Sequence, residues 1–544
     1  MKKIIISVLV CVFFIYETTF SQSYQWAVHG GGSSGDYGNS VAVDGQGNSF
    51  VTGWFQLTAT FGSFTLTSAG GYDIFIVKYN SNGQAQWAQR FGGAATDIGY
   101  GIDLDANGNI YVAGTFAGAA TFGSIMVTSN NGSPDIFVAR FDTAGNPLWV
   151  QTAGSSTDDQ AQAITVDKIN AKIYVAGYFK STATFGLIPV SSFGQSDIFI
   201  AKYDTIASVG STPLWLHQGG GTSYEIPYSV CTDGAGNVYV AGNFNGTSNF
   251  DGITVTSAGM DDVVVAKYNS QGVIKWVHRD GGAQGDRGLS VTNNDNGIYY
   301  TGWFTGTAQF GTTTLTGTLD EIFISKLDTS GNFQWANKAG GAGYDQGYGI
   351  CTDANSNVYI TGAYDSVAQF GTVTLTSAGS WDVFIAKYSP AGSFQWVMSG
   401  GSPASNTFER DIGYSIKPDT MQNLYVGGII RNTASFGPYS ITSYGIQDAF
   451  VAKISLVTSM EENFYSNEIN IFPNPSIGII NIKSGNIFIE NVEMLNTAGQ
   501  IVLSQTNSGS KGLLINVPGL EAGIYFLKIK SGEKFYYKKI VLVR

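Results

Sequence analysis

Residues 87–151 read WAQRFGGAATDIGYGIDLDANGNIYVAGTFAGAATFGSIMVTSNNGSPDIFVARFDTAGNPLWVQ. Four strand-like runs follow one another in this stretch: GYGIDLD, NIYVAGTF, DIFVARF and PLWVQ. The first run alternates apolar and polar residues, as a half-buried strand does, whereas the third is apolar on both faces. The turns that begin at Asp105 and Asp142 combine an Asx cap with a glycine that tolerates positive φ. The stretch therefore predicts a four-stranded antiparallel unit.

The same unit recurs along the chain at an almost fixed period. The tryptophans that mark it are 59 to 66 residues apart. They are Trp26, Trp87, Trp149, Trp215, Trp276, Trp335 and Trp396. A solenoid would need parallel strands and shorter coils, which the hairpin turns speak against. The pattern predicts an all-β, seven-bladed β-propeller with four-stranded antiparallel blades.

The phase of the repeat predicts how the ring closes. The chain enters at the strand around Trp26, which is normally the last strand of a unit, and it leaves the repeats at 448–453, which is normally the third. We therefore expect Tyr24–Val28 to pair with Phe450–Ser455 and to complete the last blade, which would remove two free sheet edges.

Phenylalanines recur between the second and third runs and are expected to pack in the core. They are Phe61, Phe122, Phe185, Phe250, Phe310, Phe370 and Phe436.

One acidic position recurs in the Gly-rich loop that joins successive units. Its members are Asp36, Asp97, Asp159, Glu225, Asp286, Asp345 and Asp411. In propellers such loops lie near the central channel, where two carboxylates ~10 Å apart repel by roughly 1–2 kcal/mol. One interpretation is structural: backbone N–H groups and basic side chains nearby form hydrogen bonds or ion pairs with each carboxylate. The alternative is a channel mouth that binds a sugar or a cation such as Ca²⁺. The insertion Pro403–Thr407 makes the last of these loops the asymmetric candidate.

Two further acidic positions and one basic position also recur. The second acidic series opens the first hairpin, lacks the alternating oxygen ligands of a calcium loop and is expected to cap turns: Asp44, Asp105, Asp167, Asp233, Asp353 and Asp419. The third series and the base five residues after it are expected to pair with backbone or with each other between blades. The third series is Asp73, Asp135, Asp197, Asp262, Glu321, Asp382 and Asp448. The bases are Lys78, Arg140, Lys202, Lys267, Lys326, Lys387 and Lys453.

Composition limits the partners. The 544 residues contain 28 Lys and Arg against 40 Asp and Glu, a net charge of −12, which argues against nucleic acid or an anionic membrane. Residues 1–21 have the basic start and short apolar run of a secretory signal, too short for a transmembrane helix. The remaining cysteines, Cys231 and Cys351, occupy equivalent positions of different units and are expected to be free thiols.

Catalytic signals are poor. The three histidines, His29, His217 and His278, all follow a repeat tryptophan by two or three residues and look like variants of one structural position. No nucleophile elbow, phosphate loop or metalloprotease motif appears, so we expect no catalytic residues and no bound cofactor. A binding module for glycans or proteins is the leading hypothesis. A polysaccharide hydrolase or lyase with carboxylates at the channel mouth, or a purely structural surface protein, remains the alternative.

The C-terminal residues form a different module. Residues 456–468 are a polar link, and period-two strands from 469 to 544 predict a small Ig-like β-sandwich. This segment resembles the type A C-terminal sorting domain of the Bacteroidetes type IX (Por) secretion system. The residues that carry the resemblance are Pro473, Asn474, Pro475, Gly499, Gly523, Tyr525, Lys538 and Lys539.

The repeats over residues 22–455 resemble the bacterial SBBP propeller repeats, through segments such as Asp105–Gly114. The two resemblances imply a protein that crosses the inner membrane by its signal peptide and meets the type IX machinery through its tail. We expect a monomer that ends outside the outer membrane, at the cell surface or released.

Overall fold

The computed structural model describes residues 21–206, 210–403, 410–457, 469–485, 488–496, 501–517, 519–532 and 534–543. The predicted signal before residue 21, Gly499 and most of the predicted linker and of Pro403–Thr407 lie outside these ranges. Ser23–Ser455 form one compact unit, and the residues from Leu456 belong to another. Within the described ranges the one helical element is the 3₁₀ turn η1 (Asn130–Gly132), so the protein is all-β as predicted.

The quoted stretch forms the predicted strands. They are β6 (Ile98–Leu104), β7 (Ile110–Ala117), β10 (Pro134–Phe141) and β11 (Pro147–Gly154), hydrogen-bonded in that order and antiparallel. The turn at Asp105 forms as expected, because its Oδ1 accepts the N–H groups of Asn107 and Asn109 at 2.9 Å each.

Each unit also has an outer hairpin that the sequence reading missed. Here it consists of β8 (Ala119–Phe122) and β9 (Ile125–Thr128), between the second and third strands. Its first strand pairs with β5 (Ala85–Gly93), the last strand of the preceding unit. This pairing joins each unit to its neighbour. As a result, hydrogen-bonded sheets of 10 and 16 strands contain strands from several units.

The other units repeat this order. The first strands are β2 (Tyr37–Val43), β12 (Gln160–Asp167), β18 (Glu225–Thr232), β22 (Asp286–Asn294), β26 (Gln346–Thr352) and β30 (Ile412–Pro418). The second strands, which include one arm of the hairpin where they are long, are β3 (Ser49–Phe61), β13 (Lys172–Phe179), β19 (Val238–Phe250), β23 (Gly297–Phe310), β27 (Val358–Phe370) and β31 (Leu424–Ile430). Separate hairpin strands are β14 (Thr182–Phe185), β15 (Ile188–Ser191), β32 (Thr433–Phe436) and β33 (Tyr439–Thr442).

The third strands are β4 (Phe64–Tyr79), β16 (Asp197–Asp204), β20 (Ile253–Tyr268), β24 (Thr313–Leu327), β28 (Val373–Tyr388) and β34 (Asp448–Val457). The last strands are β1 (Ser21–Gly32), β17 (Trp215–Gly221), β21 (Ile274–Gly282), β25 (Phe333–Gly341) and β29 (Phe394–Gly400).

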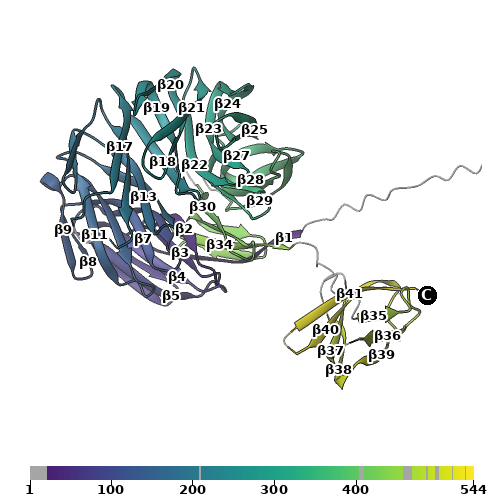
Figure 1. Ribbon diagram of the computed structural model, residues 1–544. Coiled ribbons are helices and arrows are strands. Elements are labelled where there is room, and N and C mark those ends of the chain that lie inside the picture. The colour runs from purple at the N-terminus through teal and green to yellow at the C-terminus, as the bar shows by residue number, and fades with distance from the viewer. Residues whose placement is uncertain are drawn as a thin grey trace, which may run out of the picture. The chain divides into compact units, whose positions relative to one another are not determined.

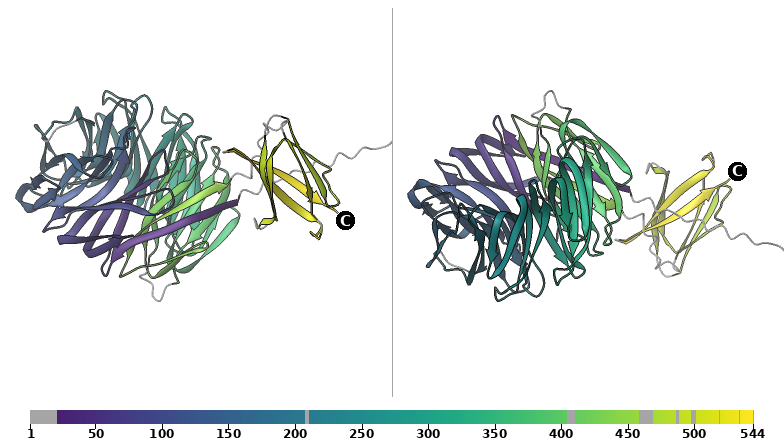
Figure 2. Two further views of the ribbon diagram at one scale, coloured as in Figure 1. Left: turned by 90° about the horizontal axis from the view of Figure 1, so that it is seen from below. Right: turned by 90° about the horizontal axis from the view of Figure 1, so that it is seen from above.

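The first strands lie innermost and contact one another in a closed cycle. The order of contacts is β2, β6, β12, β18, β22, β26, β30 and back to β2. Figure 1 shows the labels of β2, β18, β22 and β30 near the centre of this unit, with β5, β9 and β24 at its periphery. In the two views of Figure 2 the sheets of neighbouring units pack face to face.

The predicted closure is confirmed. The N-terminal strand β1 lies between β34 and β3 in the hydrogen-bonded order, so the first described residues complete the unit that the last repeat leaves open. On its other side β1 pairs with the outer hairpin of the first unit, where Gly30 lies opposite Phe61.

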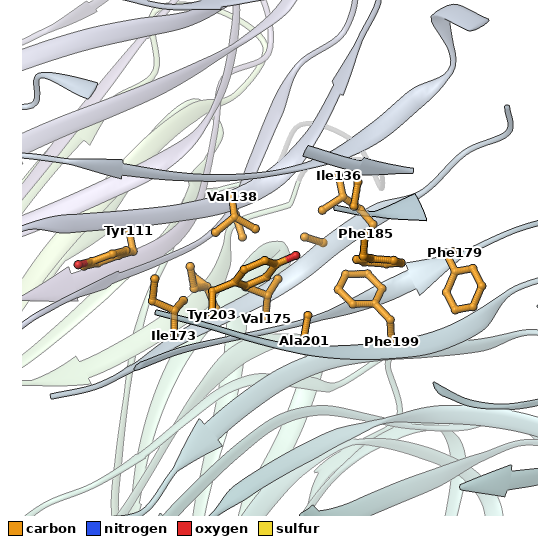
Figure 3. Packing of buried hydrophobic residues seen from close by; sticks show 14 of the residues in the cluster. Tyr111, Ile136, Val138, Ile173, Val175, Phe179, Phe185, Phe199, Ala201 and Tyr203 are labelled. Carbon is orange, nitrogen blue, oxygen red and sulfur yellow. The ribbon is translucent and has the colours of Figure 1, made fainter. Parts of the chain in front are cut away.

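Apolar layers between successive sheets form the core. One such cluster joins residues of β7 and β10, among them Tyr111 and Val138, to residues of β13 and β16, among them Val175 and Phe199 (Figure 3). The recurrent phenylalanines belong to these layers, and each is at most 1% exposed, as the sequence predicted.

Replacing Phe310 by Ala is expected to lower the free energy of unfolding by about 3–5 kcal/mol. Phe310 lies at the end of β23 in an outer hairpin, is fully buried, and has ring contacts to Phe304 at 5.9 Å and Phe323 at 4.6 Å. Denaturant unfolding measures the loss. Met126→Ala, in the equivalent hairpin but with Met126 72% exposed, is the control. Equal effects of the two substitutions would contradict the packing role.

The C-terminal unit has two antiparallel sheets. One contains β35 (Ile469–Phe472), β36 (Ile479–Ser484) and β39 (Gly512–Asn516). The other contains β38 (Ile501–Ser510), β37 (Ile489–Leu495), β40 (Gly523–Ser531) and β41 (Lys534–Leu542). Both sheets contribute to one core, for example Ile482 and Ile515 from the first and Val492 and Leu527 from the second.

Candidate functional site

The seven acids of the inter-unit loops are buried, and backbone groups hold them. None is more than 1% exposed. Asp97 is representative: its Oδ2 accepts the N–H of Gly93 in β5 at 2.7 Å, and its Oδ1 accepts the N–H of Ala117 in β7 at 3.2 Å. The carboxylate thus joins the last strand of one unit to the second strand of the next. These hydrogen bonds support the structural interpretation of the series.

Burial has an electrostatic consequence for this series. Desolvation raises the pKa of Asp97 and of Asp159 to about 6, although backbone hydrogen bonds oppose the shift. It raises the pKa of Asp36, Asp286 and Asp345 to about 7. Glu225 also reaches about 7, for the same reason.

The recurrent bases do not pair with the third acidic series. Each lies over an aromatic ring of the second strand, as Lys267 does over Tyr239 at 5.2 Å. Several of them also donate to a carbonyl of the next unit, as Lys267 does to Thr329 at 2.8 Å. Each base therefore contacts a ring of its own unit, several bases also reach a backbone carbonyl of the next unit, and the third acidic series has other partners.

A narrow polar cavity of about 120 Å³ lies between the innermost strands. Hydroxyl and carboxamide groups from several units line it, including Tyr100, Gln162, Tyr228, Tyr348 and Tyr414. Burial raises the pKa of Tyr100 and of Tyr348 to about 12, so both hydroxyls stay protonated donors at neutral pH. The cavity marks the central channel.

Aromatic and arginine side chains gather where the innermost strands begin. Tyr37 stacks on Trp54 with ring centroids 4.3 Å apart, and Trp54 contacts Tyr72 at the same centroid distance. Tyr37 also donates a 2.5 Å hydrogen bond to Gln447. Because the innermost strands are equivalent and contact in a cycle, their first residues lie at one end of the channel.

Two arginines continue this group. The guanidinium of Arg287 lies 5.3 Å from the ring centre of Trp303 and 3.3 Å from Asp261. The exposed Arg410 lies 4.4 Å from the ring centre of Trp381. Tyr348 and Tyr414 contact each other at 5.2 Å, and both pack with Tyr37 against a small core that includes Trp381.

We call this group the rim cluster. Its members are Tyr37, Trp54, Tyr72, Arg287, Trp303, Tyr348, Trp381, Arg410 and Tyr414.

Sequence reasoning missed the rim cluster because most of its positions vary from unit to unit, although Tyr348 and Tyr414 share one position with Tyr100 and Tyr228. The position that holds Trp54 and Trp303 is Thr115 and Ala363 in other units. The available signal was variation at a fixed place in an otherwise regular repeat, which marks a position that the scaffold does not require.

The three histidines have structural partners. His29 lies 2.9 Å from Asp448, His217 2.8 Å from Asp251 and His278 3.0 Å from Asp280. Among the described residues, no group of three or more His, Cys, Asp and Glu side chains is placed to hold a metal ion. Cys231 and Cys351 are free thiols, as predicted.

The sorting motifs meet at one edge of the C-terminal unit. Asn474 donates from Nδ2 to the carbonyl of Lys539, and its Oδ1 accepts the N–H of Val541, both at 2.9 Å. Peptide bonds 472–473 and 474–475 on either side are cis. Lys538 also lies on β41, Gly523 begins β40, and Tyr525 donates to the carbonyl of Glu521 at 3.0 Å. The structure thus joins the Pro473–Pro475 motif to the basic C-terminal strand.

Family models match both parts of the chain. A secretion system C-terminal sorting domain matches residues 470–543, and the SBBP β-propeller repeat matches residues 29–54 and 86–115. In the part of the chain that the structure describes, no helix has the length and hydropathy to cross a membrane.

Curated relatives are distant. An uncharacterized WD repeat-containing protein of Acanthamoeba polyphaga mimivirus is 24% identical over 446 residues, 65% of this chain and 32% of that protein. The regulatory protein FlaEY of Caulobacter vibrioides is 24% identical over 211 residues, 38% of this chain and 22% of FlaEY. The chain thus spans about a third or less of the length of these relatives.

Solved structures include two from Bacteroides thetaiotaomicron. A protein of unknown function has a TM-score of 0.30 and 11% identity, covering 80% of this chain and 100% of that chain. The extracellular domain of a hybrid two component system has a TM-score of 0.17 and 10% identity, covering 94% and 87%. The family matches identify a chain that carries SBBP β-propeller repeats and a type IX secretion system C-terminal sorting domain, which directs it to the cell surface or outside.

Proposed function

We propose that the repeats form a closed seven-bladed propeller that binds glycans through its rim cluster, on a protein exported by its C-terminal sorting domain. The closed cycle of innermost strands and the pairing of β1 with β34 support the ring. In this proposal residues 1–21 are the signal, 22–455 the propeller, 456–468 the linker and 469–544 an Ig-like sandwich.

The rim cluster is the observation that carries the binding role. Ligand sites combine aromatic surfaces with a few polar groups that fix orientation. Here indole and phenol rings stand beside the guanidinium groups of Arg287 and Arg410 and the carboxamide of Gln447. The ring faces suit the C–H faces of sugars, and the polar groups suit sugar hydroxyls.

The binding role needs neither catalysis nor a metal in this proposal. The recurrent acids accept hydrogen bonds from backbone N–H groups, and the histidines lie next to carboxylates. Both kinds of side chain therefore have structural roles. The pairing of β1 with β34 and β3 covers the strand edges that would otherwise be open where the ring closes, which favours a monomer.

Glycan binding should depend on the rim cluster. On a glycan array, the protein is expected to bind a defined set of glycans, and Trp303→Ala combined with Arg410→Ala should weaken binding at least about tenfold, because one ring face and one charge are lost. Phe193→Ala, at a 63% exposed ring in the loop that follows the hairpin strand β15, is the control and should not change binding. Adding a calcium chelator should also leave binding unchanged. An array without any bound glycan would overturn the proposal.

A further inference from the structure

Every repeat unit brings two buried carboxyl groups together, one from the loop series and one from the third series. We call each such set a carboxyl pair. The pairs are Asp36 with Asp448, Asp97 with Asp73, Asp159 with Asp135, Glu225 with Asp197, Asp286 with Asp262, Asp345 with Glu321, and Asp411 with Asp382. No member is more than 3% exposed.

A glycine lets the two carboxyl groups approach. A Cβ built on Gly92 would lie 2.7 Å from Oδ2 of Asp97 and 2.9 Å from Oδ1 of Asp73. At Gly281 the corresponding distances are 2.9 Å to Asp286 and 2.7 Å to Asp262. Because both oxygens lie within 3 Å of the point where a Cβ would stand, any side chain there would collide with them, and the glycine leaves the two carboxyl groups next to the same space.

One oxygen of each pair has no hydrogen-bond donor. These buried atoms are Oδ1 of Asp73, Asp135, Asp197, Asp262, Asp382 and Asp448. In the seventh pair the corresponding atom, Oε2 of Glu321, accepts no hydrogen bond but lies 3.5 Å from Nζ of Lys338. The other oxygen of the same group is satisfied, as in Asp382, whose Oδ2 accepts the N–H of Ala378 at 2.7 Å. If both groups were ionised, an unpaired acceptor would face another acceptor out of water, which is costly. Because this unpaired oxygen recurs along the repeat, we expect one common cause for it.

We propose that each carboxyl pair holds one shared proton in the folded protein, so that an O–H of one group donates to the unpaired oxygen of the other. Two carboxyl groups that share a buried site cannot both ionise readily. The loop acid belongs to one unit and the third-series acid to its neighbour, so the shared proton links successive units. Protons are thus a ligand of the ring, bound at equivalent sites.

Burial and the partner's negative charge act in the same direction. Desolvation, followed by the charge of Asp411, raises the pKa of Asp382 to about 7. Desolvation also raises the pKa of Asp135 to about 7, and the charge of Asp159 adds to the rise.

The charged groups around the pairs differ from unit to unit. Arg90 lies 2.6 Å from Asp73, Arg279 2.5 Å from Asp262, Lys338 3.5 Å from Glu321 and His29 2.9 Å from Asp448. Asp280 and Asp365 add negative charge beside Asp262 and Asp345, respectively. Gln218 donates to Asp197 at 2.5 Å.

The pair of Asp135 and Asp159 is the cleanest one to test. Neutral donors face it: the N–H and Nδ2 of Asn130 reach Asp135 at 2.8 and 2.9 Å, and the N–H groups of Ser155 and Lys180 reach Asp159 at 2.5 and 2.7 Å. Asp158 adds negative charge. A change at Asp135 therefore reports on the pair with little interference from a base.

Asp135→Asn tests the shared proton. It places an NH₂ donor where the unpaired oxygen stands and keeps the other oxygen as acceptor. A raised folded pKa stabilises the protein fully below the unfolded pKa of about 4, and this stability is lost as pH rises through about 7. The unfolding constant of the unsubstituted protein should therefore rise with pH between about 4 and 7. In the Asp135→Asn variant the unfolding constant should rise less steeply with pH, by a factor of up to about ten per pH unit, because one bound proton is lost. At pH 8.5 the variant should be at least as stable as the parent.

Asp295→Asn, at an exposed aspartate, is the matched control and should keep the parent's pH dependence. Asp382→Asn repeats the test in another unit, in case Asp135→Asn does not fold. Infrared spectra of the unsubstituted protein at pH 6 should contain the carbonyl band of buried protonated carboxyl groups. An absent band, or variants that lose stability equally at every pH, would overturn the proposal.

Discussion

A mature chain that begins at Ser33 should be less stable than the chain that begins at Gln22 by more than about 5 kcal/mol, because it lacks β1 and two buried aromatic side chains. Without β1, the last unit keeps an open edge at β34, and the outer hairpin of the first unit loses its partner strand. Open edges favour aggregation as well as unfolding.

The contacts of β1 explain the size of this effect. Tyr24 and Trp26 are 4% and 8% exposed. Trp26 donates to the carbonyl of Ser81 at 3.0 Å, and Tyr24 to the carbonyl of Ser399 at 3.3 Å, so β1 holds the units on both sides of the closing one. Its removal therefore affects three units at once.

Denaturant unfolding and light scattering measure the loss of β1. A synthetic peptide of residues 22–32 added to the shortened chain should restore part of the stability, because the open unit still offers the pairing edges. Gln25→Ala in the full mature chain is the control, since the Gln25 side chain is exposed. A shortened chain as stable as the parent would show that the ring does not need the N-terminal strand.

Removing Ile469–Arg544 is expected to abolish surface export and leave the folded repeats in the periplasm. The sorting domain matches residues 470–543, and these residues have their own core, so the repeats lose no packing partner that they need. The repeats of the shortened protein should therefore keep their thermal stability, although the protein lacks its sorting signal.

Cell fractionation and protease treatment of intact cells measure this export. Leu514→Ala is the matched control in the tail, because Leu514 is 56% exposed on β39 and its truncation should leave export unchanged. Normal surface levels of the shortened chain would contradict the sorting role of this segment.

Local patterns predicted the strands and turns because each depends on neighbours in sequence. The alternation in residues 98–104 and the Asx turn at Asp105 need no distant partner to be recognised. The pairing of β1 with β34 was also predictable, since the repeat begins and ends out of phase.

The outer hairpins were harder to predict. The segment from Ala119 to Thr128 forms a short hairpin whose partner, β5, belongs to another unit. Its pairing depends on how two units pack, so the local sequence showed only that Phe122 would be buried.

For the recurrent acids, the sequence predicted some properties and the tertiary structure decided others. The repeat period predicted which positions carry them, and charge repulsion predicted that each needs a local partner. Only the tertiary structure brings Asp97 beside Asp73 and leaves Oδ1 of Asp73 without a donor, because the two groups come from neighbouring units.

The sequence alone determined the all-β class, the repeating unit, the closing strand and the sorting tail, because periodicity and contiguous motifs are local. Tertiary structure decided the outer hairpins, the carboxyl pairs and the rim cluster. Tyr37 and Trp381 are far apart in the chain, and neither belongs to a recurring position. They pack into one cluster only because the innermost strands contact in a closed cycle, which gathers the variable side chains of distant units at one end of the channel.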